Sequence, residues 1–196
     1  MFYFSLIKLK TNLSSVPRPP AMDPKYLEDS ELKMTAVTET HYEGEIPESF
    51  DARERWPDCR SVKLIRDQAN CGSCWAVSTA SAMSDRLCIH SNGERQDLLS
   101  DSDILTCCVL CGSGCNGGST LRAYAWLVKV GACTGGPYAT QGVCKPYVFH
   151  PCGRRVDQPY YGDCKVKNMP TPKCRRECSA EYSKNYGDDK IFGIWN

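Results

Sequence analysis

Residues 68–75 read Gln-Ala-Asn-Cys-Gly-Ser-Cys-Trp and contain Cys74, the cysteine with the clearest signs of reactivity. The apolar spacing that follows predicts a helix over Ser73–Ile89, which places Cys74 in the first turn. There the unpaired backbone amides and the positive end of the helix dipole favour a thiolate. The amide of Gln68 can reach back over the helix start and, with the Cys74 N–H, hold a developing oxyanion. These residues predict nucleophilic acyl transfer.

Cys74 also has other interpretations. In a chain with 14 cysteines, half of a disulfide is the commoner fate of any one, and a C-x-x-C pair alone also suits a redox site. Gln68 and Trp75, at their spacing from Cys74, favour the nucleophile. A further interpretation is a zinc module with the ligands Cys71, Cys74, Cys108 and Cys111. It leaves the other ten cysteines without a Cys/His pattern to explain them.

Helices and turns must position these groups. Apolar spacing predicts two more helices, over Leu98–Cys107 and over Ser119–Val130, and Gly131 ends the second. From Thr134 onward, Gly, Pro and Cys predominate and no period is strong. The helices therefore come first, and a region of turns and cysteines follows them.

Residues 1–45 have a different character from the rest. The apolar start, Met1–Ile7, is interrupted by Lys8 and Lys10, so a signal peptide is not convincing. Prolines and charges follow, and no cysteine occurs before Cys59. We interpret residues 1–45 as a leader or pro-segment remnant with a linker.

Charge and hydropathy exclude some classes of function. A formal net charge of +1 argues against a nucleic-acid or membrane-surface protein, because an anionic polymer or surface requires a basic surplus. No stretch approaches the ~20 apolar residues of a membrane span. We expect neither partner for this chain, and no cofactor or metal.

From residue 46 on, the chain resembles the papain family of cysteine peptidases and, within it, the cathepsin B group. The matching segments are Ser49–Arg53, Arg66–Trp75, Asp85–His90, Gly114–Gly118, Gly135-Gly136, Cys144–Tyr147 and Thr171–Cys174. The resemblance implies an α+β fold of two lobes, a helical one that presents the cysteine and a β-rich one that presents a histidine and an asparagine. Residues 46–196 would be mainly the helical N-terminal lobe with an occluding-loop region at 144–178, and the β-rich lobe is largely missing.

The resemblance assigns roles to single residues. Cys74 matches the nucleophile and Gln68 the oxyanion donor. Gly117 and Gly118 match the wall along which an extended substrate lies, and glycine suits a close backbone approach. Spacing alone favours an ordinary turn at these glycines.

The loop between Cys152 and Cys164 corresponds to the occluding loop, where the family has two adjacent histidines that bind the terminal carboxylate of a substrate. Here Arg154 and Arg155 take their place. Guanidinium groups bind carboxylates bidentately, so a preference for a C-terminal end can survive. Arginine does not titrate near neutrality, so the family's pH-dependent locking of the loop is not expected. The other interpretation is an exposed basic pair on a mobile loop.

The resemblance also implies six disulfides and a protein that is lysosomal or secreted. The pairs are Cys59–Cys88, Cys71–Cys115, Cys107–Cys174, Cys108–Cys111, Cys144–Cys178 and Cys152–Cys164. Cys133 would be a free, partly buried thiol. The bridge from Cys107 to Cys174 closes the longest loop, worth about 4 kcal/mol in the chain-entropy model.

The partner groups of Cys74 are not found in the sequence. The signature predicts a histidine and an asparagine about 130–150 residues downstream of Cys74, at about positions 204–224 and beyond Asn196. His41, His90 and His150 match no catalytic position. We expect an incomplete peptidase that does not turn over peptides or proteins alone, with cystatin-like inhibitors as further partners. The alternative is a catalytically dead relative that acts as a binding or inhibitory module.

Overall fold

The computed structural model describes residues 45, 47–156, 158–165 and 167–193. The predicted leader and pro-segment therefore lies outside the described residues, except for Glu45. The elements are α2 (Ala52–Arg55), the 3-10 helix η2 (Arg60–Lys63), α3 (Cys74–His90), α4 (Asp101–Cys107), α5 (Thr120–Lys129), β1 (Gly135–Gly136) and β2 (Lys145–Pro146). None of the helices in the described residues has the length and apolar content to cross a membrane.

The helix predicted over Ser73–Ile89 is confirmed as α3, with Ser73 at its N-cap position. Its apolar spacing buries one side of the helix, including Trp75, Ala76 and Ala80. Ser73 does not cap the helix with its side chain, because its hydroxyl bonds to the hydroxyl of Tyr147 at 2.7 Å. The residue just before α3 is thus tied to a distant part of the chain.

The other two predicted helices are α4 and α5, and each follows a serine that caps it. Ser100 Oγ accepts a hydrogen bond from the Asp103 N–H at 3.0 Å, and Ser119 Oγ accepts one from the Arg122 N–H at 3.3 Å. α5 ends just before Gly131, whose φ of +71° lies in the left-handed region that favours glycine. These side-chain caps explain why both helices start where they do.

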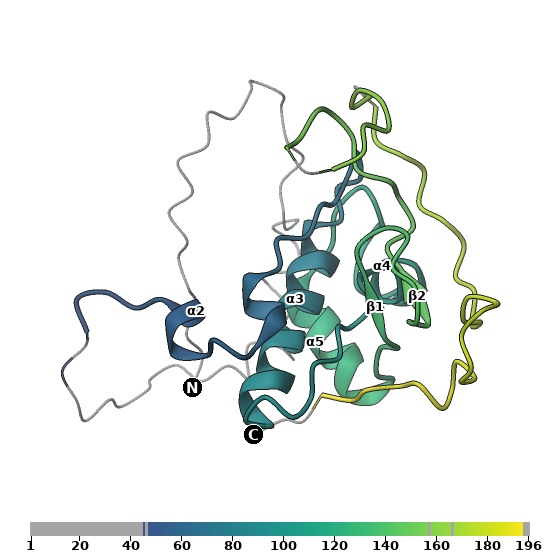
Figure 1. Ribbon diagram of the computed structural model, residues 1–196. Helices are drawn as coiled ribbons and strands as arrows, with labels where there is room; N and C mark the ends of the chain where they lie inside the picture. The colour runs from purple at the N-terminus through teal and green to yellow at the C-terminus, as the bar shows by residue number, and fades with distance from the viewer. Residues whose placement is uncertain (1–44, 46, 157, 166, 194–196) are drawn as a thin grey trace.

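α3 lies at the centre of the described residues and packs against η2, α4 and α5 (Figure 1). α4 also packs against β1 and β2, a parallel pair in which Gly135 lies opposite Lys145. Residues 167–193, the outer segment, run along the outer side of α4 and this pair (Figure 1). The described part is mainly helical with little strand, as expected of the helical part of an α+β fold.

Six disulfides join these elements, and they are the six pairs that the resemblance implies. They are Cys59–Cys88, Cys71–Cys115, Cys107–Cys174, Cys108–Cys111, Cys144–Cys178 and Cys152–Cys164. The bridge from Cys107 to Cys174 has the largest sequence separation of the six, 67 residues. It holds the end of α4 to the outer segment, which contains no helix or strand.

A buried carboxylate also holds the outer segment to α4. Asp103 accepts hydrogen bonds from Lys145 Nζ at 2.8 Å, Lys190 Nζ at 2.6 Å and the Tyr186 hydroxyl at 2.8 Å. Burial alone would raise the pKa of Asp103, but the charges of Lys145 and Lys190 outweigh it and hold that pKa below its ordinary value. Two ammonium groups thus neutralise one charge in the interior.

Candidate active site around Cys74

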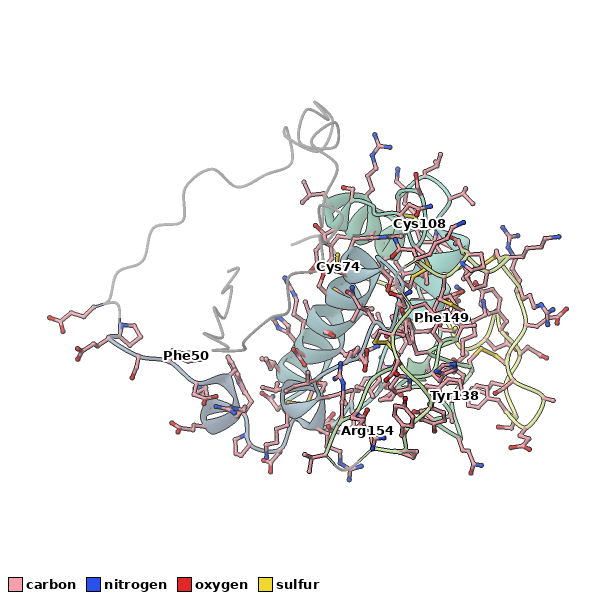
Figure 2. The ribbon with its side chains drawn as sticks, turned by 90° about the horizontal axis from the view of Figure 1, so that it is seen from above. Phe50, Cys74, Cys108, Tyr138, Phe149 and Arg154 are labelled. Carbon is pink, nitrogen blue, oxygen red and sulfur yellow. A yellow bond between two sulfur atoms is a disulfide. The ribbon has the colours of Figure 1, made fainter. Side chains whose placement is uncertain are left out.

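Cys74 lies at the N-terminal end of α3 and is half-buried (Figure 2). It is one of two cysteines outside the disulfides, and the other is Cys133. Amides in the first turn of a helix have no carbonyl partner one turn back, so a negative charge is stabilised there. The placement of this thiol suits a nucleophile.

Gln68 lies in a turn that leads to α3. The turn is closed by the Ala69 N–H, which donates to Asp67 Oδ1 at 2.7 Å. Ala69 has a φ of +53°, which is uncommon for a residue with a Cβ atom. A second hydrogen bond fixes the turn, from the Met169 N–H to the Asn70 carbonyl at 2.8 Å.

Tyr147 joins this turn to the start of α3, and the sequence analysis assigned it no role. Its hydroxyl donates to the Gln68 carbonyl at 2.8 Å and lies 2.7 Å from Ser73 Oγ. Tyr147 follows β2 directly and is buried. Its sequence neighbours give no sign of this contact, because Gln68 is 79 positions away.

A buried ion pair anchors the chain just before the turn. Arg66 Nη1 lies 2.8 Å from Asp101 Oδ2, and both side chains are almost fully buried. The same guanidinium donates to the Leu99 carbonyl and to Ser84 Oγ. Arg66 therefore connects the approach to Gln68 with both α3 and α4. The sequence does not predict this ion pair: Arg66 begins a segment that matches the family, but nothing there indicates Asp101 as its partner.

Gly117 ends a tight turn over residues 114–117, and Gly118 follows it beside Trp75. A Cβ atom on Gly118 would come within 2.6 Å of the Trp75 ring, so the packing of that ring requires glycine there. Gly118 also pairs with Gly112 in an antiparallel bridge, and Gly117 has a φ of +109°. The turn that spacing favoured is present, and Trp75 gives a reason for the glycine that does not involve a substrate.

Two contacts hold this turn next to the nucleophile. The Cys71–Cys115 disulfide joins the residues just before α3 to the turn, and the Gly72 N–H donates to the Cys115 carbonyl at 2.8 Å. Trp75 Nε1 donates to the Gly114 carbonyl at 3.1 Å. These contacts hold the segment of Gly117 and Gly118 next to the start of α3, and its role toward a substrate stays a prediction.

The two loop arginines have different surroundings. Arg155 Nη2 lies 3.0 Å from Asp67 Oδ2, so this side chain reaches the residue before Gln68. The Arg154 guanidinium lies 4.9 Å from the centre of the Tyr160 ring, in its own loop. The structure therefore links the loop to the Gln68 turn through Arg155 alone of the two.

The described histidines lie in other settings. His90 is the last residue of α3, about 24 Å from Cys74 along the helix at ~1.5 Å per residue. His150 stacks on Tyr161 at 5.4 Å between ring centres and meets Tyr138 edge to face. His41 lies outside the described residues.

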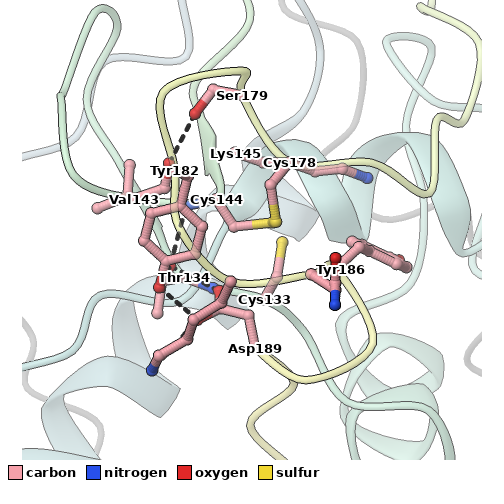
Figure 3. Close-up of a disulfide and its surroundings, with 12 residues drawn as sticks. Cys133, Thr134, Val143, Cys144, Lys145, Cys178, Ser179, Tyr182, Tyr186 and Asp189 are labelled. Carbon is pink, nitrogen blue, oxygen red and sulfur yellow. Dashed lines mark hydrogen bonds and ion pairs between the residues drawn. A yellow bond between two sulfur atoms is a disulfide. The ribbon is translucent and has the colours of Figure 1, made fainter.

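Cys133 is fully buried rather than partly buried, and its main chain bonds to the start of α4, with its N–H donating to Asp103 Oδ2 at 3.2 Å and its carbonyl accepting from the Ser100 N–H at 2.8 Å. Its sulfur points toward the Cys144–Cys178 disulfide (Figure 3). The sulfur atoms of Cys133 and Cys144 and an oxygen of Asp189 lie within 4.8 Å of one another. Because the Cys144 sulfur is bonded to Cys178, this group does not offer three metal ligands.

The zinc interpretation is wrong for the same reason. It required thiolates at Cys71, Cys108 and Cys111 in addition to Cys74. Cys71 is bonded to Cys115, and Cys108 is bonded to Cys111. Only one of the four predicted ligands is left with a thiol.

Comparison with known proteins agrees with this geometry. Residues 46–191 match the papain family cysteine proteases. Cathepsin B-like cysteine proteinase 1 of Ostertagia ostertagi is 45% identical over 174 residues, which are 87% of this chain and 51% of that protein. Cathepsin B-like cysteine proteinase 6 of Caenorhabditis elegans is 50% identical over 150 residues, 76% of this chain and 40% of that protein.

A solved structure is also similar. The procathepsin B S9 of Trypanosoma congolense aligns with a TM-score of 0.58 and 34% identity, over 76% of this chain and 45% of that one. The chain spans about half the length of the relatives it matches. Its matched region includes the cysteine at the start of α3, the Gln68 turn and the glycine turn. The chain therefore belongs to the papain family of cysteine proteases.

Proposed function

We propose that this chain is the nucleophile-bearing part of a cathepsin B-like cysteine peptidase, with Cys74 as the attacking group. The observation that supports this most is the different fate of two neighbouring cysteines. Cys71 is bonded to Cys115, whereas Cys74 keeps its thiol at the N-terminus of α3. A reactive thiol requires this arrangement, since a disulfide sulfur cannot attack a carbonyl carbon.

In the proposed reaction the Cys74 thiolate attacks the carbonyl carbon of the scissile peptide bond. The carbonyl electron pair moves to oxygen, and the oxyanion accepts hydrogen bonds from the Cys74 N–H and the Gln68 amide. When the intermediate collapses, the C–N bond breaks, the amine leaves with a proton, and a thioester remains. Water then attacks the thioester, which releases the acid and returns the thiol.

The departing amine needs a proton from an acid, and this step needs a group beyond Cys74 and Gln68. In the papain family a histidine oriented by an asparagine supplies it. His90 lies at the far end of α3, and His150 forms a cluster of three rings with Tyr138 and Tyr161. We propose that Cys74 works with an imidazole contributed by the second lobe of a complete enzyme.

The proposed substrates are peptides and proteins bound in extended form along Gly118. In the antiparallel bridge between Gly112 and Gly118, the hydrogen bonds run from Ser113 to Gly117 and from Ser119 to Cys111. The main chain of Gly118 is therefore directed away from Gly112 and toward the side where a peptide can pair with it. Cystatin-like inhibitors would use the same surface. Six disulfides favour an oxidising setting, which is the basis for proposing a lysosomal or secreted enzyme.

For the loop, we propose that Arg155 is the anchor and Arg154 the group that receives a substrate carboxylate. Arg155 already contacts Asp67, whereas Arg154 is exposed and stacked on Tyr160. Neither guanidinium loses its charge near neutrality, so the arginine side of this anchor does not titrate as a histidine would. The test is the binding of a pair of peptides that differ only in a free or amidated C-terminus. Arg154→Ala should abolish the preference for the free acid, and an unchanged preference would contradict this role.

The test of the proposed function is covalent labelling with a peptidyl epoxide that alkylates thiols. One equivalent should add to the 196-residue protein, and peptide mapping should place it on Cys74. Cys74→Ala should abolish labelling, while Cys133→Ala should leave it unchanged. A folded protein that the epoxide does not label would favour the alternative, a catalytically dead binding module.

A further inference from the structure

We infer that Tyr147 is a positioning residue for acyl transfer, holding the Gln68 turn against the start of α3 so that the Gln68 amide is aligned with the oxyanion. The inference rests on the proposed function of Cys74 and Gln68. It adds a residue that lies outside the signature and reaches it only through the fold.

The hydrogen bonds of Tyr147 have a definite direction. The Gln68 carbonyl can only accept, so the Tyr147 hydroxyl gives its single proton to it across 2.8 Å. The Ser73 hydroxyl, 2.7 Å away, must then donate to the Tyr147 oxygen. One phenol oxygen thus connects the residue before Cys74 with the residue proposed as oxyanion donor.

Tyr147 is itself fixed by its surroundings, so it can hold the Gln68 turn in place. It is buried, its N–H donates to the Gly136 carbonyl at 2.8 Å, and its ring meets Phe149 edge to face at 5.9 Å. Burial raises the pKa of Tyr147, so the hydroxyl keeps its proton in acidic and neutral solution. It therefore remains a donor to Gln68 under all conditions in which a peptidase of this family would act.

Gln68 depends on such a contact because it belongs to no helix or strand. Its neighbour Ala69 has a left-handed backbone, and Asp67 is linked to the loop through Arg155. Regular backbone hydrogen bonds therefore do not set the separation of Gln68 from Cys74. An oxyanion donor is effective only when it is within a few tenths of an ångström of its place, so a loose turn would lower catalysis without unfolding the protein.

The experiment uses a reversible peptide aldehyde and iodoacetamide on the 196-residue protein. The Cys74 sulfur adds to the aldehyde carbon, the C=O bond opens, and its oxygen becomes an oxyanion or takes the thiol proton. A ¹³C label on the aldehyde carbon reports this adduct by NMR. Iodoacetamide alkylates the same sulfur by displacement of iodide and forms no oxyanion. The two reagents therefore separate oxyanion alignment from thiol reactivity.

Tyr147→Phe keeps the ring and removes the hydroxyl. We expect it to weaken aldehyde binding about fivefold, the equivalent of one ordinary hydrogen bond, and to leave the iodoacetamide rate within about twofold. Gln68→Ala should weaken the aldehyde at least as much. In the double variant the two losses should not add, because Tyr147 acts through Gln68.

Ser73→Ala is a second variant that keeps the Tyr147–Gln68 bond, and it should change aldehyde binding less than Tyr147→Phe does. Unchanged aldehyde binding in Tyr147→Phe, additive losses in the double variant, or a parallel fall in the iodoacetamide rate would each overturn the positioning role. If Cys74 of the unaltered protein forms no adduct, the proposed function itself fails. The Tyr147→Phe measurement therefore tests the positioning role by comparison with the adduct of the unaltered protein.

Discussion

Two cysteines keep their thiols in this protein, and their surroundings separate their chemistry. Cys74 is half-buried at the N-terminus of a helix, whereas Cys133 is fully buried. Burial, and then the charge of Asp103, raise the pKa of the Cys133 thiol well above its ordinary value. A thiol without access to solvent and without a thiolate form is inert.

We therefore predict one fast thiol in the folded protein and two in the unfolded protein. Disulfide exchange reagents at pH 8 should titrate Cys74 within minutes, and Cys133 should react only after guanidinium is added. Mass spectrometry of the alkylated peptides identifies each site. Rapid labelling of Cys133 in the folded state would contradict its burial. In the matched control, Cys133→Ala, only the Cys74 thiol should be titrated before and after unfolding.

Ala69 is strained at the residue scale, and this strain can be tested. Its φ of +53° brings the Cβ atom close to a backbone carbonyl oxygen, a contact that glycine avoids. We expect Ala69→Gly to raise the free energy of unfolding by about 1 kcal/mol, after the greater freedom of glycine in the unfolded chain is deducted. Urea unfolding measures the difference.

Ala82 offers the matched control for that substitution. It lies within α3, where Gly costs about 1 kcal/mol relative to Ala, so Ala82→Gly should have the opposite sign. A decrease in stability for both variants would argue that the turn at Ala69 is not left-handed.

At the scale of elements, Asp103 connects α4 with the outer segment through Lys145 and Lys190. We expect Asp103→Asn to cost about 3 kcal/mol or more at pH 7, because two buried ammonium groups lose the one negative charge that pairs with them. Chemical unfolding at fixed pH measures this loss. Asp97→Asn, in the exposed pair with Arg95, should cost less than about 1 kcal/mol and serves as the control.

The same carboxylate predicts a pH dependence with a definite sign. The pKa of Asp103 is lower in the folded protein than its ordinary value, so its contribution is complete above about pH 4. It is lost as the pH falls through the lowered folded value, when the carboxylate takes a proton. The stability difference between the unaltered protein and Asp103→Asn should therefore shrink below pH 4. A difference that stays constant into acid would contradict this linkage.

Two disulfides of the α4 region differ in how much chain they close. The Cys107–Cys174 bridge spans 67 residues and the Cys108–Cys111 bridge spans 3. In the chain-entropy model, replacing the first pair by serines should cost about 4 kcal/mol and replacing the second about 2 kcal/mol. Thermal unfolding of the two double-serine variants compares them directly, and equal losses would show that strain or local packing outweighs loop entropy.

At the scale of the whole molecule, the described residues contain a nucleophile and a proposed oxyanion donor but place no histidine at the start of α3. We predict that the 196-residue polypeptide is labelled at Cys74 but does not hydrolyse a dipeptidyl fluorogenic substrate. The reason is that the leaving amine needs a proton donor, and of the described histidines His90 lies at the far end of α3 and His150 packs against Tyr138 and Tyr161. Hydrolysis that disappears in Cys74→Ala would refute this prediction, and a trace that persists in that variant would reveal a contaminating peptidase.

Short-range features of this molecule could be predicted from the sequence. The helix after Ser73 and the caps at Ser100 and Ser119 depend on neighbouring residues, so their patterns are legible in the order of amino acids. The reactive position of Cys74 follows from the same local signal. The disulfide pairs were implied only by resemblance, because cysteine spacing by itself allows many pairings.

What only the tertiary structure decided are contacts between residues distant in the chain. The hydroxyl of Tyr147 reaches Gln68 and Ser73, Arg155 reaches Asp67, and the Trp75 ring explains the glycine at 118. Each depends on distances that the packing of α3, α4 and the parallel strand pair sets, and no local pattern encodes them. The sequence by itself predicted Cys74 as the nucleophile, because helix start and residue type are local, and the structure shows that Cys74 lies outside the six disulfides. The groups that hold its surroundings in place became visible only in the fold, because they come from segments that are far apart in the chain.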